Sequence, residues 1–131
     1  MTAAAVAELA VEAQPRAVPD ARRALAAALE RAGVPAPAAA DACLVLTELL
    51  SNALQHGTPR ADGSLGVAWQ IAADELVIEV RDGGPAGVDR APQAAPGESG
   101  GRGLLLARAL STTVELLPSL DGTTARATLP R

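Results

Sequence analysis

The sequence predicts an α+β fold in which helices cover one face of a mixed, mainly antiparallel sheet, a two-layer sandwich. Three segments have the apolar spacing or end signals of helices, and five have the composition of strands. Most of the predicted strands are joined in pairs by short turns, which is typical of antiparallel pairing. At 131 residues, we expect one domain over residues 1–131 that buries about two thirds of its unfolded surface.

The first half of the chain is predicted to contain one strand and two helices. Residues 6–13 form the strand, and the first helix spans residues 19–32, with Asp20 in its first turn and Gly33 at its end. The second helix spans residues 37–56 and carries a long apolar pattern. We expect both helices to pack on the sheet through their apolar residues.

The second half is predicted to contain two hairpins with a helix between them. A segment rich in Pro, Gly and Ala precedes this helix, and its lack of periodicity predicts a mobile lid. The hairpins turn at Ala73-Asp74 and at Leu120-Asp121-Gly122. In chain order the predictions are a loop at 58–63, strands at 64–72 and 75–81, the lid at 88–101, the helix at 103–110, and strands at 112–117 and 123–129.

Composition restricts both the core and the class of protein. Trp69 is the only aromatic residue, so the core must be aliphatic, and Trp69 is expected on the sheet within it. The net charge of −4 and the absence of a basic stripe argue against nucleic-acid binding. One cysteine, Cys43, excludes an internal disulfide, and its place in the helical pattern favours packing over reactivity.

The same composition predicts a cytoplasmic protein. Residues 1–13 carry Glu8 and Glu12 and lack the positive start of a signal peptide. No apolar run is long enough to cross a bilayer, so we expect no membrane contact. A lone cysteine fits a reducing compartment. Arginine without any lysine, together with many Ala, Pro and Gly residues, is typical of a GC-rich bacterial genome.

Three polar residues of the second helix form the first candidate site. Glu48 and Asn52 are four residues apart, so they stack on one helix face, and His56 continues the line. An amide oxygen can bind Mg²⁺, and a carboxylate can accept a proton. The alternative is that these residues are the solvated edge of an amphipathic helix.

A second candidate site follows the predicted strand at residues 75–81. Asp82-Gly83-Gly84-Pro85 ends this strand, so the Asp82 carboxylate faces a space in which residues without side chains leave room for a flat ligand. The alternative is an ordinary turn at a strand end.

A third candidate site is the glycine-rich segment at residues 97–103, which runs directly into an apolar helix. A helix N-terminus presents unpaired N–H groups and the positive end of a dipole, so the segment is a candidate anion site. It is neither a Walker loop, since the chain lacks lysine, nor a dinucleotide fingerprint. The alternative is a flexible linker.

The order of these motifs resembles that of the GHKL superfamily of ATP-binding domains (the Bergerat fold), and above all the stand-alone anti-sigma factor serine/threonine kinases. Residues 46–57, LTELLSNALQHG, are similar to the family's N-box. Residues 80–85, VRDGGP, and 100–104, GGRGL, resemble its two glycine boxes, and Gly122-Thr123-Thr124 resembles its terminal Gly-Thr. The resemblance covers residues 6–129.

At the adenine end, the resemblance implies that Asp82 accepts a hydrogen bond from the exocyclic amine. Gly84 would let the base lie close to the backbone, and Thr123 would contact the base. His56, at the end of the N-box line, counts among the nucleotide-binding positions. The alternatives are that His56 caps the helix end and that Thr123 is a plain strand former.

At the phosphate end, the resemblance implies that Asn52 holds Mg²⁺ and that Gly101, Arg102 and Gly103 close over the triphosphate. Arg102 would supply charge, although it is also a candidate for a solvated side chain. Glu48 would be the general base that takes a proton from water or from a serine hydroxyl.

Two functions agree with this resemblance. The first is an ATP-dependent protein serine/threonine kinase that phosphorylates an anti-sigma-factor antagonist and also binds a sigma factor. The second is an ATP-dependent binding module that regulates a partner and scarcely turns over ATP. Glu48 favours the first, because a pure binder needs no base there. The small basic group Arg16, Arg22 and Arg23 is expected to be a solvated face, although the resemblance implies that this region contributes to partner contacts. The resemblance also implies a possible homodimer, because many relatives dimerise.

Overall fold

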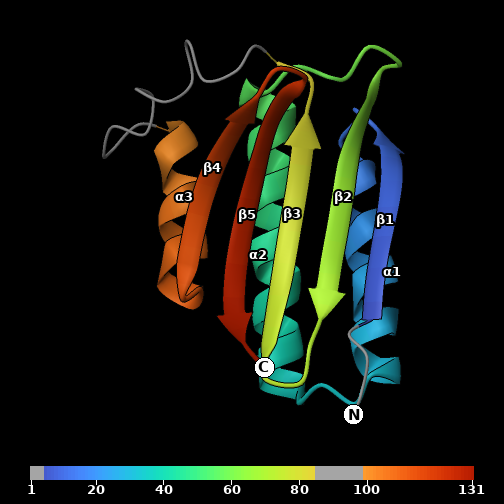
Figure 1. The fold of residues 1–131 in the computed structure, drawn as a ribbon, viewed down its shortest axis with the longest axis vertical. Coiled ribbons are helices and arrows are strands. Elements are labelled where there is room, and N and C mark those ends of the chain that lie inside the picture. The colour runs from blue at the N-terminus through green and yellow to red at the C-terminus, as the bar shows by residue number, and fades with distance from the viewer. Residues whose placement is uncertain (1–4, 85–98) are drawn as a thin grey trace.

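The computed structural model describes residues 5–84 and 99–131, which form an antiparallel sheet of five strands with three helices on one face (Figure 1). This is the α+β two-layer arrangement that the sequence predicted, and every strand pair in the described part is antiparallel. None of the helices in this part is long and apolar enough to span a bilayer.

The elements follow the predicted order along the chain. The sheet order is β1-β2-β3-β5-β4, so β3 lies at the centre. The bounds are β1 (Ala5–Glu12), α1 (Ala17–Arg31), α2 (Ala36–His56), β2 (Ser64–Ile71), β3 (Glu75–Asp82), α3 (Ser99–Leu110), β4 (Thr113–Ser119) and β5 (Gly122–Pro130).

The largest difference from the sequence prediction concerns α3. The helix begins at Ser99, four residues before the predicted start at Gly103, so the glycines of the predicted anion loop belong to the helix itself. Glycine is unfavourable in a helix but does not exclude it, and this segment contains neither proline nor a β-branched residue. Residues 88–98 of the predicted lid lie outside the described residues.

The end of α1 at Gly33 is confirmed, and its geometry explains the stop. Gly33 has φ +73°, a conformation that glycine adopts without strain. Its N–H donates to the carbonyl of Glu30, and the N–H of Val34 donates to the carbonyl of Leu29, both at 3.0 Å. These two bonds pair carbonyls that the helix end would otherwise leave unpaired.

An aliphatic core fills the space between the helices and the sheet. Leucines dominate it, and Trp69 is 5% exposed on the helix-covered face of β2, which confirms that it is a core residue. Cys43 is half-buried against this core, and burial raises the pKa of its thiol. The fully buried leucines are Leu25, Leu29, Leu46, Leu50, Leu65 and Leu76, among others.

The other face of the sheet carries a chain of ion pairs that crosses four strands. Arg81 of β3 donates to Glu8 of β1 at 2.8 Å and to Glu79 of its own strand at 2.6 Å. Glu79 also accepts from Arg126 of β5 at 2.6 Å. The Glu8 and Arg81 side chains meet across β2, where Gly66 and a small alanine leave room.

Replacing Glu79 with glutamine should make the protein less stable at neutral pH and flatten its response to acid. Burial alone would raise the pKa of Glu79, but hydrogen bonds from Arg126 and Arg81 outweigh it and lower this pKa below its ordinary value of 4.5. The stabilisation is therefore complete above that value and lost as the pH falls through the folded-state pKa. We expect Glu79→Gln to lower the free energy of unfolding at pH 7 by about 1–2 kcal/mol.

Urea unfolding at pH 7 and at about pH 3 measures this difference. The matched control is Glu75→Gln, an exposed glutamate on the same strand, which should leave stability nearly unchanged. A Glu79→Gln penalty of equal size at both pH values would contradict the assignment.

Candidate functional site

Helix α2 carries Glu48, Asn52 and His56 on one line. The residues are four apart, so each lies about 6 Å further along the helix axis than the one before it. Glu48 and Asn52 are half-buried, and His56, the last residue of the helix, is exposed. The predicted helix is present, and it holds the two half-buried polar groups on a rigid element.

The Asp82 carboxylate lies buried at the end of β3. Asp82 is 5% exposed, and its Oδ1 accepts a hydrogen bond of 3.0 Å from the backbone N–H of Gly84. A buried carboxylate requires such partners, because its charge has lost most of its water. The turn after the strand therefore orients the acceptor that the sequence predicted.

The carboxylate of Asp82 packs against the end of α2. A methyl group placed on Gly57 would lie 2.5 Å from Asp82 Oδ2 and 2.7 Å from the carbonyl oxygen of Ala53, closer than real contacts allow. Glycine at this position thus lets the end of α2 meet the end of β3. The close approach brings Asp82 beside the helix that carries Glu48 and Asn52.

Thr123 lies next to Asp82 on the neighbouring strand. The two residues pair directly in the β3–β5 register, and Thr123 is 5% exposed. Its Oγ1 is buried without a hydrogen-bond partner among the residues that the structure describes. Such a hydroxyl is costly unless a ligand or water pairs with it, so Asp82 and Thr123 together form a polar pair suited to a polar ligand edge.

The sequence analysis missed the contribution of the loop after α2. Gly83 donates its N–H to the carbonyl of Thr58 at 2.8 Å, and a methyl group on Gly84 would lie 3.4 Å from Thr58 Oγ1. A methyl group on Gly83 would lie 2.6 Å from Arg60 Cα. Both glycines therefore allow close packing against the loop after α2, and no sequence signal marked Thr58 as their neighbour.

The first turn of α3 contains Gly101, Arg102 and Gly103. Helix geometry leaves the first four N–H groups unpaired, which here belong to residues 99–102. The N–H groups of Gly101 and Arg102 are among these four, and that of Gly103 is not. Helix α3 packs against α2, so this turn belongs to the layer that carries Asn52.

Asp82 and Thr123 are the buried polar groups at the end of β3. Within residues 5–84 and 99–131, no cluster of three or more His, Cys, Asp and Glu side chains is placed to hold a metal. The buried Asp82 carboxylate, the glycines around it and the Thr123 hydroxyl, which has no partner among the described residues, lie close together at the end of β3. The amide oxygen of Asn52 is the kind of single ligand that Mg²⁺ takes when phosphates supply the others.

Comparisons with known proteins identify the family. The sequence profile of the histidine kinase-like ATPase domain matches residues 11–129. No curated protein matches the chain significantly. The chain therefore belongs to the histidine kinase-like (GHKL) ATPase domain family, and a domain of this family is an ATP-binding domain.

Solved structures agree on the fold. The RsbU and RsbW domains of a Mycobacterium tuberculosis protein match with TM-score 0.71 and 22% identity over 95% of this chain, which spans 31% of that one. The SiaB–SiaC complex of Pseudomonas aeruginosa matches with TM-score 0.61 and 17% identity over 94% of this chain and 89% of that one.

A third similar structure is the histidine kinase domain of a blue-light activated histidine kinase from Erythrobacter litoralis. It matches with TM-score 0.52 and 25% identity over 74% of this chain and 46% of that one.

Adding one methyl group at Gly57 should disturb the contact between α2 and Asp82. The methyl group would clash with a carboxylate oxygen and with a backbone oxygen that cannot rotate away. We expect Gly57→Ala to lower the free energy of unfolding by about 1–3 kcal/mol, the usual cost of overpacking. Urea unfolding of this variant and of Gln55→Ala, an exposed change in the same helix turn, gives the comparison. Equal stability of the two variants would show that the end of α2 does not need this glycine.

Proposed function

We propose that this chain is an ATP-dependent protein serine/threonine kinase of the anti-sigma factor type, which transfers the γ-phosphate of ATP to an antagonist protein. The observation that carries the proposal is the Asp82 carboxylate, buried and oriented beside the end of the helix that bears Asn52 and Glu48. Gly57 and Glu48 are about 13 Å apart along the helix axis. The base and the phosphates of a bound nucleotide would therefore contact different groups.

The adenine would bind at the Asp82 end of the site. Asp82 would accept a hydrogen bond from the exocyclic amine, and the Thr123 hydroxyl would pair with the base directly or through a water. Gly84 would leave room for the flat ring beside the backbone. The unpaired hydroxyl of Thr123 supports this orientation, because a bound base would remove the cost of its burial.

The phosphates would lie further along α2. Asn52 would hold Mg²⁺ through its amide oxygen, and the ion, when bound, would neutralise charge on the phosphates. Gly101 and Arg102 would face the phosphates with two of the first four N–H groups of α3 and with one guanidinium, and Gly103, which has no side chain, would let the helix lie close to the triphosphate. His56, exposed at the end of α2, would lie nearer the base than Asn52 does.

Glu48 would act as the general base. It would take the proton from a serine or threonine hydroxyl of the protein substrate, and that oxygen would form a bond to the γ-phosphorus. The bond from phosphorus to the bridging oxygen would break as ADP leaves. A half-buried carboxylate one helix turn from the metal ligand is suited to this step, because it is both accessible to substrate and held on a rigid element.

The proposal of a protein partner rests on two of the structures with a similar fold. The SiaB–SiaC structure is a complex between two proteins, and the RsbW domain was solved together with an RsbU domain. We infer that this chain also acts on a protein partner, an anti-sigma-factor antagonist, and that a sigma factor is a second partner. The cytoplasm is the compartment where both would be found.

Asp82→Asn should weaken ATP binding severely. The change keeps the size of the side chain but replaces one acceptor oxygen with a donor amide that opposes the amine of adenine. We expect at least a tenfold rise in the dissociation constant, since a hydrogen bond to a charged group is worth about 1.5–3 kcal/mol. Calorimetry with ATP and Mg²⁺ measures it, and Asp74→Asn, at the exposed hairpin turn, is the control.

Asn52→Ala should weaken ATP binding only when Mg²⁺ is present, because Asn52 is assigned to the metal. If wild-type protein binds ATP no better than Asp82→Asn or Asn52→Ala, the proposed site is wrong.

Glu48→Gln should bind ATP within a few-fold of wild type but lose phosphotransfer. Glutamine keeps the shape and hydrogen-bonding reach of glutamate and removes its basicity, and a positioned base contributes about 10²–10⁴-fold in rate. Incubation with labelled ATP, Mg²⁺ and candidate antagonist proteins measures transfer, with Glu30→Gln on the exposed face of α1 as control. Full turnover in Glu48→Gln would refute the mechanism. If wild type shows no transfer and Glu48→Gln still regulates its partner, the chain is instead an ATP-dependent binding module.

A further inference from the structure

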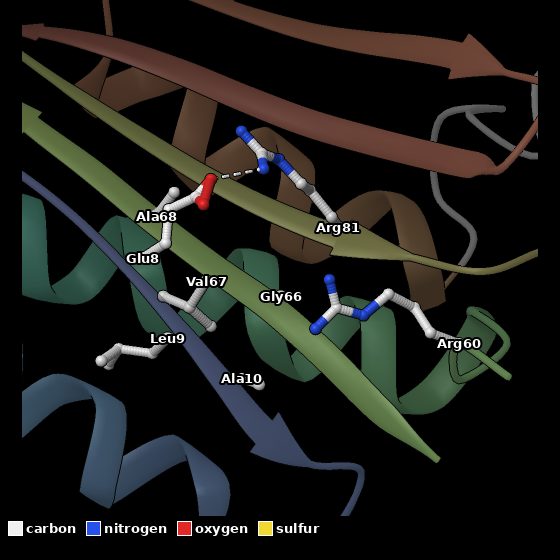
Figure 2. A pocket seen from close by; sticks show the side chains of 8 residues that line it. All are labelled: Glu8, Leu9, Ala10, Arg60, Gly66, Val67, Ala68 and Arg81. Atoms are coloured by element: carbon white, nitrogen blue, oxygen red, sulfur yellow. Dashed lines mark hydrogen bonds and ion pairs between the residues drawn. The ribbon is translucent and has the colours of Figure 1, made fainter. Parts of the chain in front are cut away.

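A hollow of about 160 Å³ lies on the face of the sheet that the helices leave uncovered (Figure 2). Strands β1, β2 and β3 form its base, and Glu8, Arg60, Gly66 and Arg81 are among the residues that line it. The candidate nucleotide site uses none of these side chains. The hollow is therefore a separate feature of the molecule.

The Arg60 guanidinium is held over the hollow by a short hydrogen-bonded relay. Arg60 Nε and Nη2 donate to Ser64 Oγ at 3.1 and 2.9 Å. Ser64 Oγ in turn donates to Asp62 Oδ1 at 2.6 Å, and the same oxygen accepts from the Ser64 N–H. These bonds to Ser64 lower the pKa of Asp62 below its ordinary value, so the carboxylate stays ionised and the relay stays fixed.

Gly66 makes the space that the guanidinium occupies. A methyl group on Gly66 would lie 2.9 Å from Arg60 Nη1, so any side chain on this strand position would displace the arginine. Glycine within a strand weakens it and often marks a close approach by another group. Here the approaching group is a cation, and its Nη1 edge has no hydrogen-bond partner among the described residues.

In the described part of the chain, Arg60 reaches the Asp62 carboxylate through Ser64 and not directly. Arg81 lines the opposite side, where Figure 2 shows it joined to Glu8, and it also pairs with Glu79. Arg60 has no carboxylate within ion-pair distance in the described part of the chain. A preorganised guanidinium with an open edge is the group that binds carboxylate and phosphate oxygens most specifically.

We propose that this hollow, the Arg60 pocket, binds a small oxyanion, a phosphate or carboxylate group. The Nη1 edge of Arg60 donates to the anion, the Asp62–Ser64 relay keeps the guanidinium in place, and Gly66 gives the anion access to it. Arg81, on the opposite side, is already paired with Glu8 and Glu79, so Arg60 supplies the charge that binds the anion. The pocket shares no side chain with the proposed nucleotide site, so its test does not rest on the proposed function.

Nuclear magnetic resonance of the arginine side chains and amides tests the proposal with two probes, inorganic phosphate and acetate. Sodium chloride keeps the ionic strength constant, because general screening shifts many resonances without saturating. We expect a saturable shift of the Arg60 Nε–H and of the Gly66 and Ser64 amides with at least one probe. Saturation by phosphate alone assigns a phosphate ligand, and saturation by acetate assigns a carboxylate ligand.

Arg60→Gln should weaken the response of the Gly66 amide at least tenfold, the loss expected for a charge-assisted hydrogen bond. Arg60→Lys, which keeps the charge without the forked geometry, should weaken it less. Arg23→Gln removes an exposed arginine of α1 and should leave the response intact. Unchanged saturation in Arg60→Gln, or no saturable shift in wild type with either probe, would overturn the proposal.

Discussion

The contact between Gly57 and the Asp82 carboxylate fixes how the helical layer meets the sheet in this molecule. Helix α2 ends and strand β3 ends at the same place, and only a residue without a side chain lets them approach so closely. The buried leucines of α2 hold the helix on the sheet, but apolar packing is not directional. The close approach of Gly57 to Asp82 therefore fixes where the end of α2 lies relative to β3, and with it the distance from Asp82 to Asn52 and Glu48.

The two faces of the sheet are stabilised by different means. Aliphatic side chains and Trp69 cover the inner face, and ion pairs with small residues cover the outer one. Pairs with half-exposed partners add little stability individually. Glu79 is the exception because its side chain is only 11% exposed and two arginines bond it, so its loss would leave both cations without their buried partner.

The sequence predicted the elements well because their signals are local. Apolar periodicity, the glycine after α1 and the turn residues of the two hairpins depend on neighbours along the chain. The start of α3 was predicted wrongly because glycine content indicates a loop, whereas Ser99–Leu110 is helical in the structure. Gly57 and Gly66 each contact a residue that only the fold brings near. The sequence therefore could not predict why glycine is needed at these two positions. The motif order could indicate Asp82, Asn52 and Thr123, but not that the Thr123 hydroxyl is buried without a partner among the described residues.

The loop after α2 connects the two sites on opposite faces of the sheet. Thr58 and the Arg60 backbone pack against Gly83, which follows Asp82, while the Arg60 side chain crosses to the outer face over Gly66. A methyl group on Gly83 would clash with Arg60 Cα, so the backbones at Gly83 and Arg60 are in close contact. A nucleotide that shifts Gly83 must then shift Arg60, and an anion that fixes Arg60 must restrict Gly83. If both ligands bind as proposed, linkage requires each to change the affinity of the other by the same factor.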